Sequence, residues 1–183
     1  MNKFLKWQNQ DNPNKNRILA LVVGALIFPI TIPVLLVFVL PHVDKTFGIG
    51  SLSYGLVNII FGVMAIIIGG IVAIWTIVIQ ITLASGTPFP MLPTKKLLIV
   101  GPFKYCRNPM TLGTIMAYGG IAIWIGSLTA LLAVAIFAAI LIGYLKIIEE
   151  KELQLRFGSE YVEYKKKTPF MIPIKIRRID SKK

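Results

Sequence analysis

Hydrophobic positions in this 183-residue chain form long uninterrupted runs rather than the short alternations of a soluble protein. Uncharged stretches cover Ile18–Leu40, Thr46–Thr94 and Met110–Leu145. About 20 consecutive apolar residues are enough to cross the hydrocarbon core of a bilayer. The pattern therefore predicts an integral membrane protein, with residues 1–183 forming a single membrane domain.

Four transmembrane helices are expected, which makes the predicted fold class an all-α membrane protein. Their predicted bounds are Ile18–Leu40, Tyr54–Leu83, Met110–Ile125 and Leu128–Lys146. The last two form a tight hairpin that turns at Gly126-Ser127. Pro29 and Pro33 should bend the first helix because proline has no backbone donor, and neighbouring helices can supply hydrogen bonds to the carbonyls that it frees.

The connections between these helices differ in character. A first loop is expected over Pro41–Ser53, and a long irregular loop over Ser85–Pro109, where five prolines prevent a continuous helix. Beyond the membrane the last helix should continue as an amphipathic cytoplasmic helix, with Leu153 and Phe157 on one face, and end at Thr168-Pro169. Close helix packing is predicted at the small residues of the second helix, Gly55, Gly62, Gly69 and Gly70.

Basic residues are distributed very unevenly across the predicted membrane. In the four-helix arrangement 19 of the 20 lysines and arginines fall on one side, and only Lys45 falls on the other. By the positive-inside rule both termini, the proline-rich loop and the tail are cytoplasmic. The net charge of +12 therefore fits anionic lipid headgroups better than nucleic acid, because it lies beside membrane helices.

Several kinds of chemistry have no support in the sequence. One cysteine, Cys106, and one histidine, His42, give no Cys/His cluster, so no metal site is predicted. The hydrolase and nucleotide-binding signatures GxSxG, HExxH and the Walker loop do not occur. A small transporter is disfavoured because the predicted spans contain no charged residues of the kind that line ion routes.

Two polar motifs flank the helical hairpin. The first runs from Gly101 to Pro109 with the letters GPFKYCRNP, and the second contains Glu149, Glu150, Tyr161 and Tyr164. The hairpin returns the chain to the side that it left, so both motifs should meet at one membrane face. Polar groups at the mouth of an apolar bundle indicate a site for a polar cofactor and an apolar substrate.

Each motif also has a purely structural interpretation. Arg107 offers a fork for a carboxylate, but it can equally be a positive-inside arginine in front of a helix-start proline. Glu149 and Glu150 can pair with Lys146 and Gln154 on their own helix, and Glu152 with Arg156. The two tyrosines can be interfacial anchors.

Taken together, the motifs resemble the membrane methyltransferases of the isoprenylcysteine carboxyl methyltransferase and phospholipid methyltransferase group. The similarity covers about residues 85–173. It implies S-adenosylmethionine as cofactor, in a cytoplasm-facing pocket. The residues implied to bind the cofactor are Gly101, Pro102, Tyr105, Arg107, Asn108, Pro109, Glu149 and Glu150.

The resemblance also implies roles in the reaction. Arg107, Asn108 and Tyr161 are the expected catalytic residues, and Tyr164 and Thr111 are expected to approach the substrate. Two positions depart from the family pattern, since Asn108 replaces a histidine and Thr111 a tyrosine. Asparagine does not titrate near neutrality, so no imidazole base is available at this point.

The implied function is methyl transfer to a lipidic or small hydrophobic acceptor. Its nucleophile is an isoprenylcysteine-type carboxylate, a phospholipid amine or a thiol. Membrane lipids are the expected partners. The alternative is a non-catalytic scaffold or lipid-binding protein that retains the fold.

Overall fold

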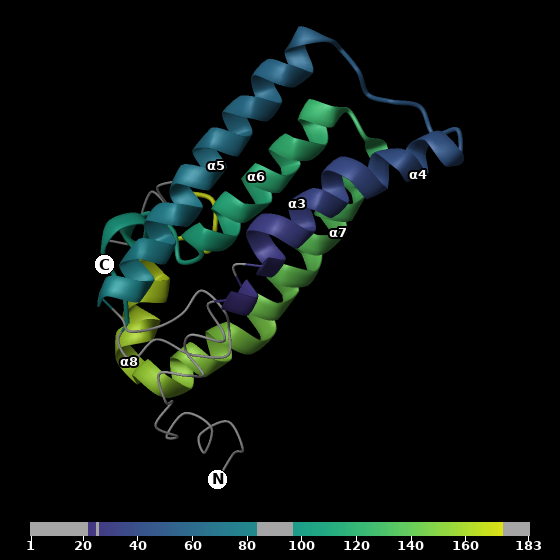
Figure 1. Ribbon diagram of the computed structural model, residues 1–183. Coiled ribbons are helices and arrows are strands. Elements are labelled where there is room, and N and C mark those ends of the chain that lie inside the picture. Colours follow the sequence, from purple (N-terminus) through teal and green to yellow (C-terminus); the bar gives the residue numbers. More distant parts are fainter. Residues whose placement is uncertain (1–21, 25, 84–96, 174–183) are drawn as a thin grey trace, which may run out of the picture.

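The computed structural model describes residues 22–24, 26–83 and 97–173, and within these ranges every regular element is helical. The predicted N-terminal lead-in, the start of the first helix and residues 85–96 of the proline-rich loop lie outside the described residues. The helices stand side by side as a bundle, and the C-terminal helix turns across its lower end (Figure 1).

Three helices are long and apolar enough to cross a membrane, which makes this a membrane protein. They cover Val22–Thr46, Leu56–Leu83 and Leu128–Lys167. In the most apolar 18-residue stretch of each helix, only 11–12% of the residues are buried within the protein. The remaining apolar surface has no protein partner, as expected of helices surrounded by lipid. A fourth apolar helix, Pro109–Ile125, has 17 residues and is shorter than the other three.

The first helix is irregular where its prolines occur. Its described part contains two π-helical turns, η1 (Ile27–Thr31) and η2 (Leu35–Val39), separated by the short helix α3 (Ile32–Val34). In a π turn an amide donates five residues back, so the missing donor of Pro33 leaves the Phe28 carbonyl without a partner. The Tyr118 hydroxyl donates to that carbonyl at 2.6 Å. A neighbouring helix thus satisfies a carbonyl that proline has freed, as predicted.

The first loop begins later than predicted. Helix α4 (Leu40–Thr46) continues the first helix through residues 41–46, the first six residues of the expected loop Pro41–Ser53. Pro41 lies inside this continuous helix, directly after η2, and it removes one amide donor from the helical hydrogen-bond series.

Helices α5 (Leu56–Leu83) and α6 (Pro109–Ile125) form the closest pair in the bundle. Gly69 faces Gly113 and Gly62 faces Gly120, so the two helices run antiparallel. A Cβ atom on Gly69 would lie 2.5 Å from the Gly113 carbonyl oxygen, which is closer than van der Waals contact permits. The predicted small-residue packing is confirmed for Gly62 and Gly69, whereas Gly70 faces open space.

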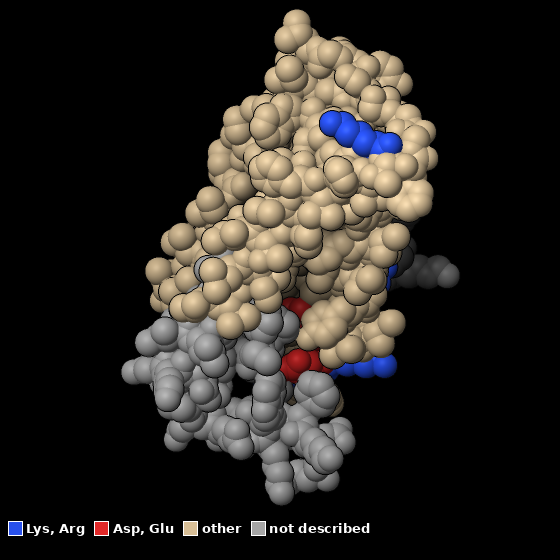
Figure 2. All heavy atoms as spheres, turned by 45° about the vertical axis from the view of Figure 1, so that its right-hand side comes forward, with Lys and Arg blue, Asp and Glu red and all other residues tan. Residues whose placement is uncertain are grey.

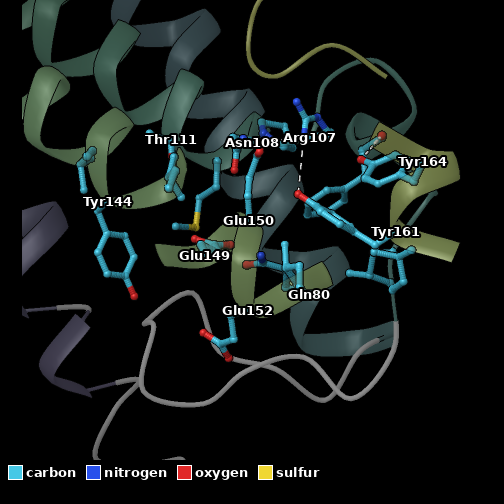
Figure 3. A pocket seen from close by; sticks show the side chains of 18 of the residues that line it. Gln80, Arg107, Asn108, Thr111, Tyr144, Glu149, Glu150, Glu152, Tyr161 and Tyr164 are labelled. Atoms are coloured by element: carbon cyan, nitrogen blue, oxygen red, sulfur yellow. Dashed lines mark hydrogen bonds and ion pairs between the residues drawn. The ribbon is translucent and has the colours of Figure 1, made fainter. Parts of the chain in front are cut away.

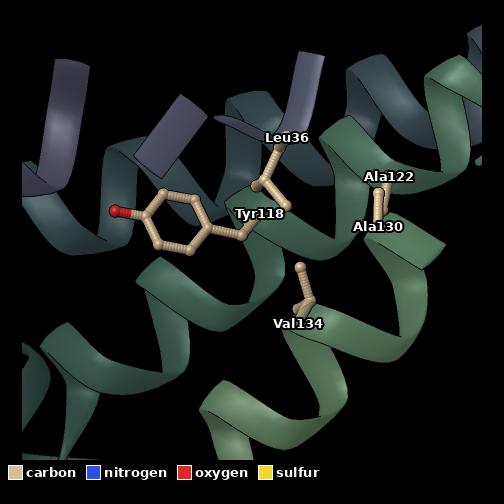
Figure 4. Close-up of a cluster of buried hydrophobic side chains, with 5 residues drawn as sticks. All are labelled: Leu36, Tyr118, Ala122, Ala130 and Val134. Carbon is tan, nitrogen blue, oxygen red and sulfur yellow. The ribbon is translucent and has the colours of Figure 1, made fainter. Parts of the chain in front are cut away.

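The hairpin between α6 and α7 (Leu128–Tyr144) turns where predicted. Gly126 takes the left-handed conformation with φ of 70°, and the Ser127 side chain caps α7 by accepting a hydrogen bond from the Ala130 amide. Beside this turn a buried cluster joins the first helix to the hairpin (Figure 4). It consists of Leu36, Tyr118, Ala122, Ala130 and Val134.

The last helix does not stop at Lys146. It passes through a π turn, η4 (Leu145–Glu149), into α8 (Glu150–Lys167), which ends before Thr168-Pro169 as expected. Its uncharged part, Leu128–Leu145, has 18 residues, and at 1.5 Å per residue it spans roughly the hydrocarbon core. Residues from Lys146 onward therefore lie beyond the membrane-spanning part.

Candidate functional site

The first motif forms a short connection into α6. A 3₁₀ turn, η3 (Gly101–Lys104), packs against the end of α5 and buries Pro102 and Phe103. Gly101 has φ of +55°, and a side chain at this position would collide with Ile79. Pro109 then begins α6 at its first position, where a missing amide donor costs little. The turn and the helix start together fix Arg107 and Asn108 at the end of the bundle where α6 begins.

The C-terminal segment after α8 is bonded to this connection. The Arg107 amide donates to the Pro169 carbonyl at 3.0 Å, and the Asn108 side chain donates to the Phe170 carbonyl at 3.0 Å. The Phe170 ring lies between two cations, with Arg107 5.6 Å and Lys146 5.1 Å from its centroid. Asn108 therefore holds the C-terminal segment in place rather than capping α6.

The two tyrosines reach the site because α8 bends sharply at Gly158. This residue has φ of 53° and ψ of −127°, a conformation that side chains with a Cβ atom rarely adopt. The second half of α8 folds back, and both Tyr161 and Tyr164 become buried. The Tyr164 hydroxyl donates to the Phe103 carbonyl at 2.6 Å, so it joins the C-terminal segment to the first motif.

An ion pair joins the two motifs directly. The Arg107 guanidinium binds the Glu150 carboxylate, and both side chains are only 10–12% exposed. Lys165, from the folded-back half of α8, binds the other oxygen of Glu150. Arg107 also donates to the Tyr161 hydroxyl at 3.4 Å. The partner of Glu150 is thus an arginine 43 positions away and not the neighbouring Gln154.

These residues surround a cavity of about 450 Å³. Its volume lies within the range of small-molecule sites. Figure 3 shows Glu149, Glu150 and Tyr161 gathered at this cavity together with Arg107 and Asn108. On the surface, acidic side chains appear in a recess at the lower end of an otherwise largely uncharged face (Figure 2). No group of metal-binding side chains occurs in the described part of the chain.

The electrostatics of the cavity centre on Glu149. Burial raises the pKa of this carboxyl to about 7, and the nearby Glu152 and Glu150 carboxylates act in the same direction, while Arg156 opposes them. Among described residues Glu149 forms no salt bridge, unlike Glu150 and Glu152. Burial also raises the pKa of the Tyr161 hydroxyl, so at neutral pH this group remains a hydrogen-bond donor.

Among the described residues, two buried polar atoms at the cavity have no hydrogen-bond partner. They are Oε1 of Gln80, near the end of α5, and Nε of Arg107. A buried polar group without a partner costs free energy comparable to a lost hydrogen bond. One acceptor and one donor are therefore available for a ligand with complementary groups.

Most of the residues singled out from the sequence meet at this cavity. Those that line it are Arg107, Asn108, Pro109, Thr111, Glu149, Glu150, Tyr161 and Tyr164. Three others do not: Gly101 packs on α5, Pro102 is buried beneath the connection, and Tyr105 points away and is 64% exposed. The Glu152–Arg156 pair forms as predicted, and it too lines the cavity.

Several further lining residues were hard to predict from sequence patterns. Gln80, Thr114, Tyr144 and Phe28 come from four different helical segments, and all border the cavity. Gln80 carried the one available signal, a large amide in the last turns of a transmembrane helix, where polar side chains are costly and often functional. Phe28 and Tyr144 look like ordinary apolar or interfacial positions.

Comparison with known protein families identifies the chain. Residues 57–160, more than half of the sequence, match the family described as phospholipid methyltransferase. Comparisons with curated individual proteins and with solved structures gave no match. The matched segment runs from the start of α5 to the folded-back part of α8 and contains Gln80, Arg107, Glu149 and Glu150. By this match the chain belongs to the phospholipid methyltransferase family.

Proposed function

We propose that the protein is an S-adenosylmethionine-dependent methyltransferase that acts on a lipidic or small hydrophobic acceptor. The observation that carries this proposal is the buried Arg107–Glu150 ion pair, which brings both sequence motifs to one cavity at the end of a membrane bundle. Membership of a methyltransferase family supports the reaction class.

The chemical groups at the cavity fit such a cofactor. Its ammonium group, sulfonium and ribose hydroxyls require acceptors or negative charge, which Glu149, Glu150 and the free Gln80 Oε1 offer. Its carboxylate requires a donor, and Arg107 Nε is one. Glu150 and Arg107 also neutralise each other, so together they add no net charge to a partly buried site.

When bound, the cofactor supplies a methyl group on a positively charged sulfur, which a nucleophile can take in one in-line displacement. The protein then needs to align the partners and exclude water. Arg107 and Glu150 are held from several sides, by each other, Lys165, Phe170 and Tyr161. Tyr161 keeps its proton and contributes a hydroxyl donor, while Asn108 fixes the C-terminal segment over the site.

The cavity also extends to the lipid-facing surface. Ile140 on α7 borders it and is 65% exposed, and Phe28 and Leu141 add further apolar wall. An acceptor with a hydrocarbon part can therefore lie against these side chains while its nucleophile reaches the polar end. Carboxylate, amine and thiol acceptors all satisfy this arrangement.

For the membrane arrangement we propose that α6 is a fourth span and that both termini and the site are cytoplasmic. The 19-to-1 distribution of basic residues supports it. Single cysteines at Ser51 and Ser181 should be labelled from opposite sides of the membrane by an impermeant thiol reagent. Equal labelling of both from outside would rule out this topology.

The function is tested by incubating the detergent-solubilised protein with methyl-labelled S-adenosylmethionine, a membrane lipid extract and a panel of thiols. We expect label in one product, whose mass identifies the acceptor. Calorimetry with S-adenosylhomocysteine separates this proposal from a non-catalytic scaffold. A protein that neither binds this ligand nor transfers methyl is not the proposed enzyme.

A further inference from the structure

The amide and hydroxyl side chains of α5 differ in how their polar atoms are satisfied. Asn58 makes three hydrogen bonds, to Tyr54, Leu52 and Ile123. Thr76 and Thr82 donate to carbonyls of their own helix at 2.7 Å. Gln80 is the exception within this helix, because its buried Oε1 has no hydrogen-bond partner in the part of the chain that the structure describes.

The position of Gln80 makes this difference informative. It lines the cavity from α5, while Glu149 lines it from the end of η4, and Figure 3 shows the Gln80 amide directed toward the Glu149 carboxylate. Two oxygen-bearing groups thus border the same partly buried cavity. Among the described residues, Gln80 Oε1 has no hydrogen-bond donor, and the Glu149 carboxylate has no salt-bridge partner.

The other charged groups at the cavity do not fill this role. Arg107 is bound to Glu150 and Arg156 to Glu152, so the guanidinium groups are engaged with other carboxylates. An anion placed between Gln80 Oε1 and Glu149 would meet two acceptors and no donor. A positively charged nitrogen that bears hydrogens would satisfy both oxygens.

We propose that Gln80 and Glu149 together bind a protonated amine of the ligand, with Gln80 as a specificity residue outside the two sequence motifs. This proposal rests on the function proposed above. The amine has two possible sources, the amino-acid part of the cofactor and the headgroup of an amine-bearing lipid acceptor.

The test uses Gln80→Leu and Gln80→Met in the full-length protein. Loss of a hydrogen bond to a charged group weakens binding by about tenfold or more. If the amine belongs to the cofactor, both variants weaken S-adenosylhomocysteine binding in calorimetry by that factor. If it belongs to the acceptor, they leave that affinity unchanged and raise the KM for a short-chain ethanolamine phospholipid. Binding of its glycerol counterpart, measured by calorimetry, then stays unchanged.

Gln154→Leu provides the control, since Gln154 is exposed on α8 and does not border the cavity. Thermal stability of the ligand-free protein separates binding from structure. Removing a buried acceptor that has no partner should leave the unfolding temperature unchanged or raise it. A lower unfolding temperature, with both ligands weakened equally, would indicate a structural role and overturn the proposal.

Unchanged affinity and unchanged KM in both Gln80 variants would also overturn it, while methyl transfer by the wild type would leave the proposed function intact. Conversely, a wild type that binds no S-adenosylhomocysteine contradicts the proposed function. In that case the role of Gln80 is decided without a cofactor. Calorimetry then compares the affinities of the wild type and the Gln80 variants for the ethanolamine phospholipid and for its glycerol counterpart.

Discussion

The two ends of the bundle differ in how completely their buried polar groups are hydrogen-bonded. At the end formed by α4 and the α6–α7 turn, Asp44 accepts hydrogen bonds from the Ser127 hydroxyl and the Thr129 amide, and Asn58 has all its polar atoms paired. The opposite end, where α6 begins, instead has a cavity. There Gln80 Oε1 and Arg107 Nε have no hydrogen-bond partner among the described residues, and the pKa of the Glu149 carboxyl is raised.

This difference shows which polar groups serve the fold and which are available for a ligand. Asp44 lies 85 positions before Thr129 and fastens the first helix to the start of α7, so its bonds are structural. Polar groups at the cavity are held in place but not fully satisfied. Substitutions at the first end should therefore change stability alone, and substitutions at the cavity should change ligand binding first.

The largest effect is expected for Asp44→Ala. It removes both bonds to the α7 start and leaves buried donors without an acceptor, which should lower the free energy of unfolding by about 3 kcal/mol. Thermal unfolding in detergent measures the loss. Calorimetry on the folded fraction should show unchanged affinity for S-adenosylhomocysteine, and a reduced affinity would mean that the two ends are coupled.

Next in size is the effect of Glu150→Gln. The neutral amide cannot balance Arg107 and Lys165, so S-adenosylhomocysteine binding should weaken by about 2 kcal/mol, more than tenfold. We expect Glu149→Gln to act in the same direction.

The matched control for these variants is Glu163→Gln. Glu163 is exposed, pairs only with Lys166 and Lys167 among the residues described, and does not border the cavity. Glu152 is less suitable because it lines the cavity. Equal, near-wild-type affinity in Glu149→Gln, Glu150→Gln and Glu163→Gln would remove the acidic pair from the site.

Gly158→Ala should have a somewhat smaller effect, confined to the cavity end. The alanine has room for its Cβ, but its backbone conformation costs about 1–2 kcal/mol. The backbone should relax part of this strain by changing the bend, which would displace Tyr161 and weaken ligand binding. Gly143→Ala is the control, because it also has room and lies in regular helix. Identical binding by both variants would show that the bend at Gly158 does not support the site.

The smallest expected effect is a pH dependence that originates in Glu149. Its pKa is raised from 4.5 to about 7, so in the ligand-free protein its contribution to stability is complete below pH 4.5 and is lost as the pH rises to 7. A cationic ligand prefers the ionised carboxylate. Affinity for S-adenosylmethionine should therefore increase by up to about tenfold between roughly pH 6 and 8.

Calorimetry at several pH values measures this increase, and Glu149→Gln should flatten it. The neighbouring groups at the cavity are Glu150, Glu152, Arg156 and Tyr144. A pH profile that persists unchanged in Glu149→Gln would show that Glu149 is not its origin.

Local interactions were predictable from the sequence. The apolar runs, the turn at Gly126-Ser127 and the helix start at Pro109 depend on residues close together in the chain. The Glu152–Arg156 pair follows from the 3.6-residue helical period alone. Eight of the eleven site residues predicted from the two motifs line the cavity, because the hairpin length determines where both motifs emerge from the membrane.

Only the tertiary structure decided which side chains face one another. The π turn at Leu145–Glu149 and the bend at Gly158 rotate and redirect the helix after the membrane. As a result Glu150 meets Arg107 rather than Gln154. The packing of the earlier elements leaves Tyr105 exposed and outside the cavity lining, and it brings Gln80 of α5 to the cavity. Helical periodicity determines neighbours on one helix, but the rotation of each helix about its axis depends on packing between helices, which the sequence pattern does not specify.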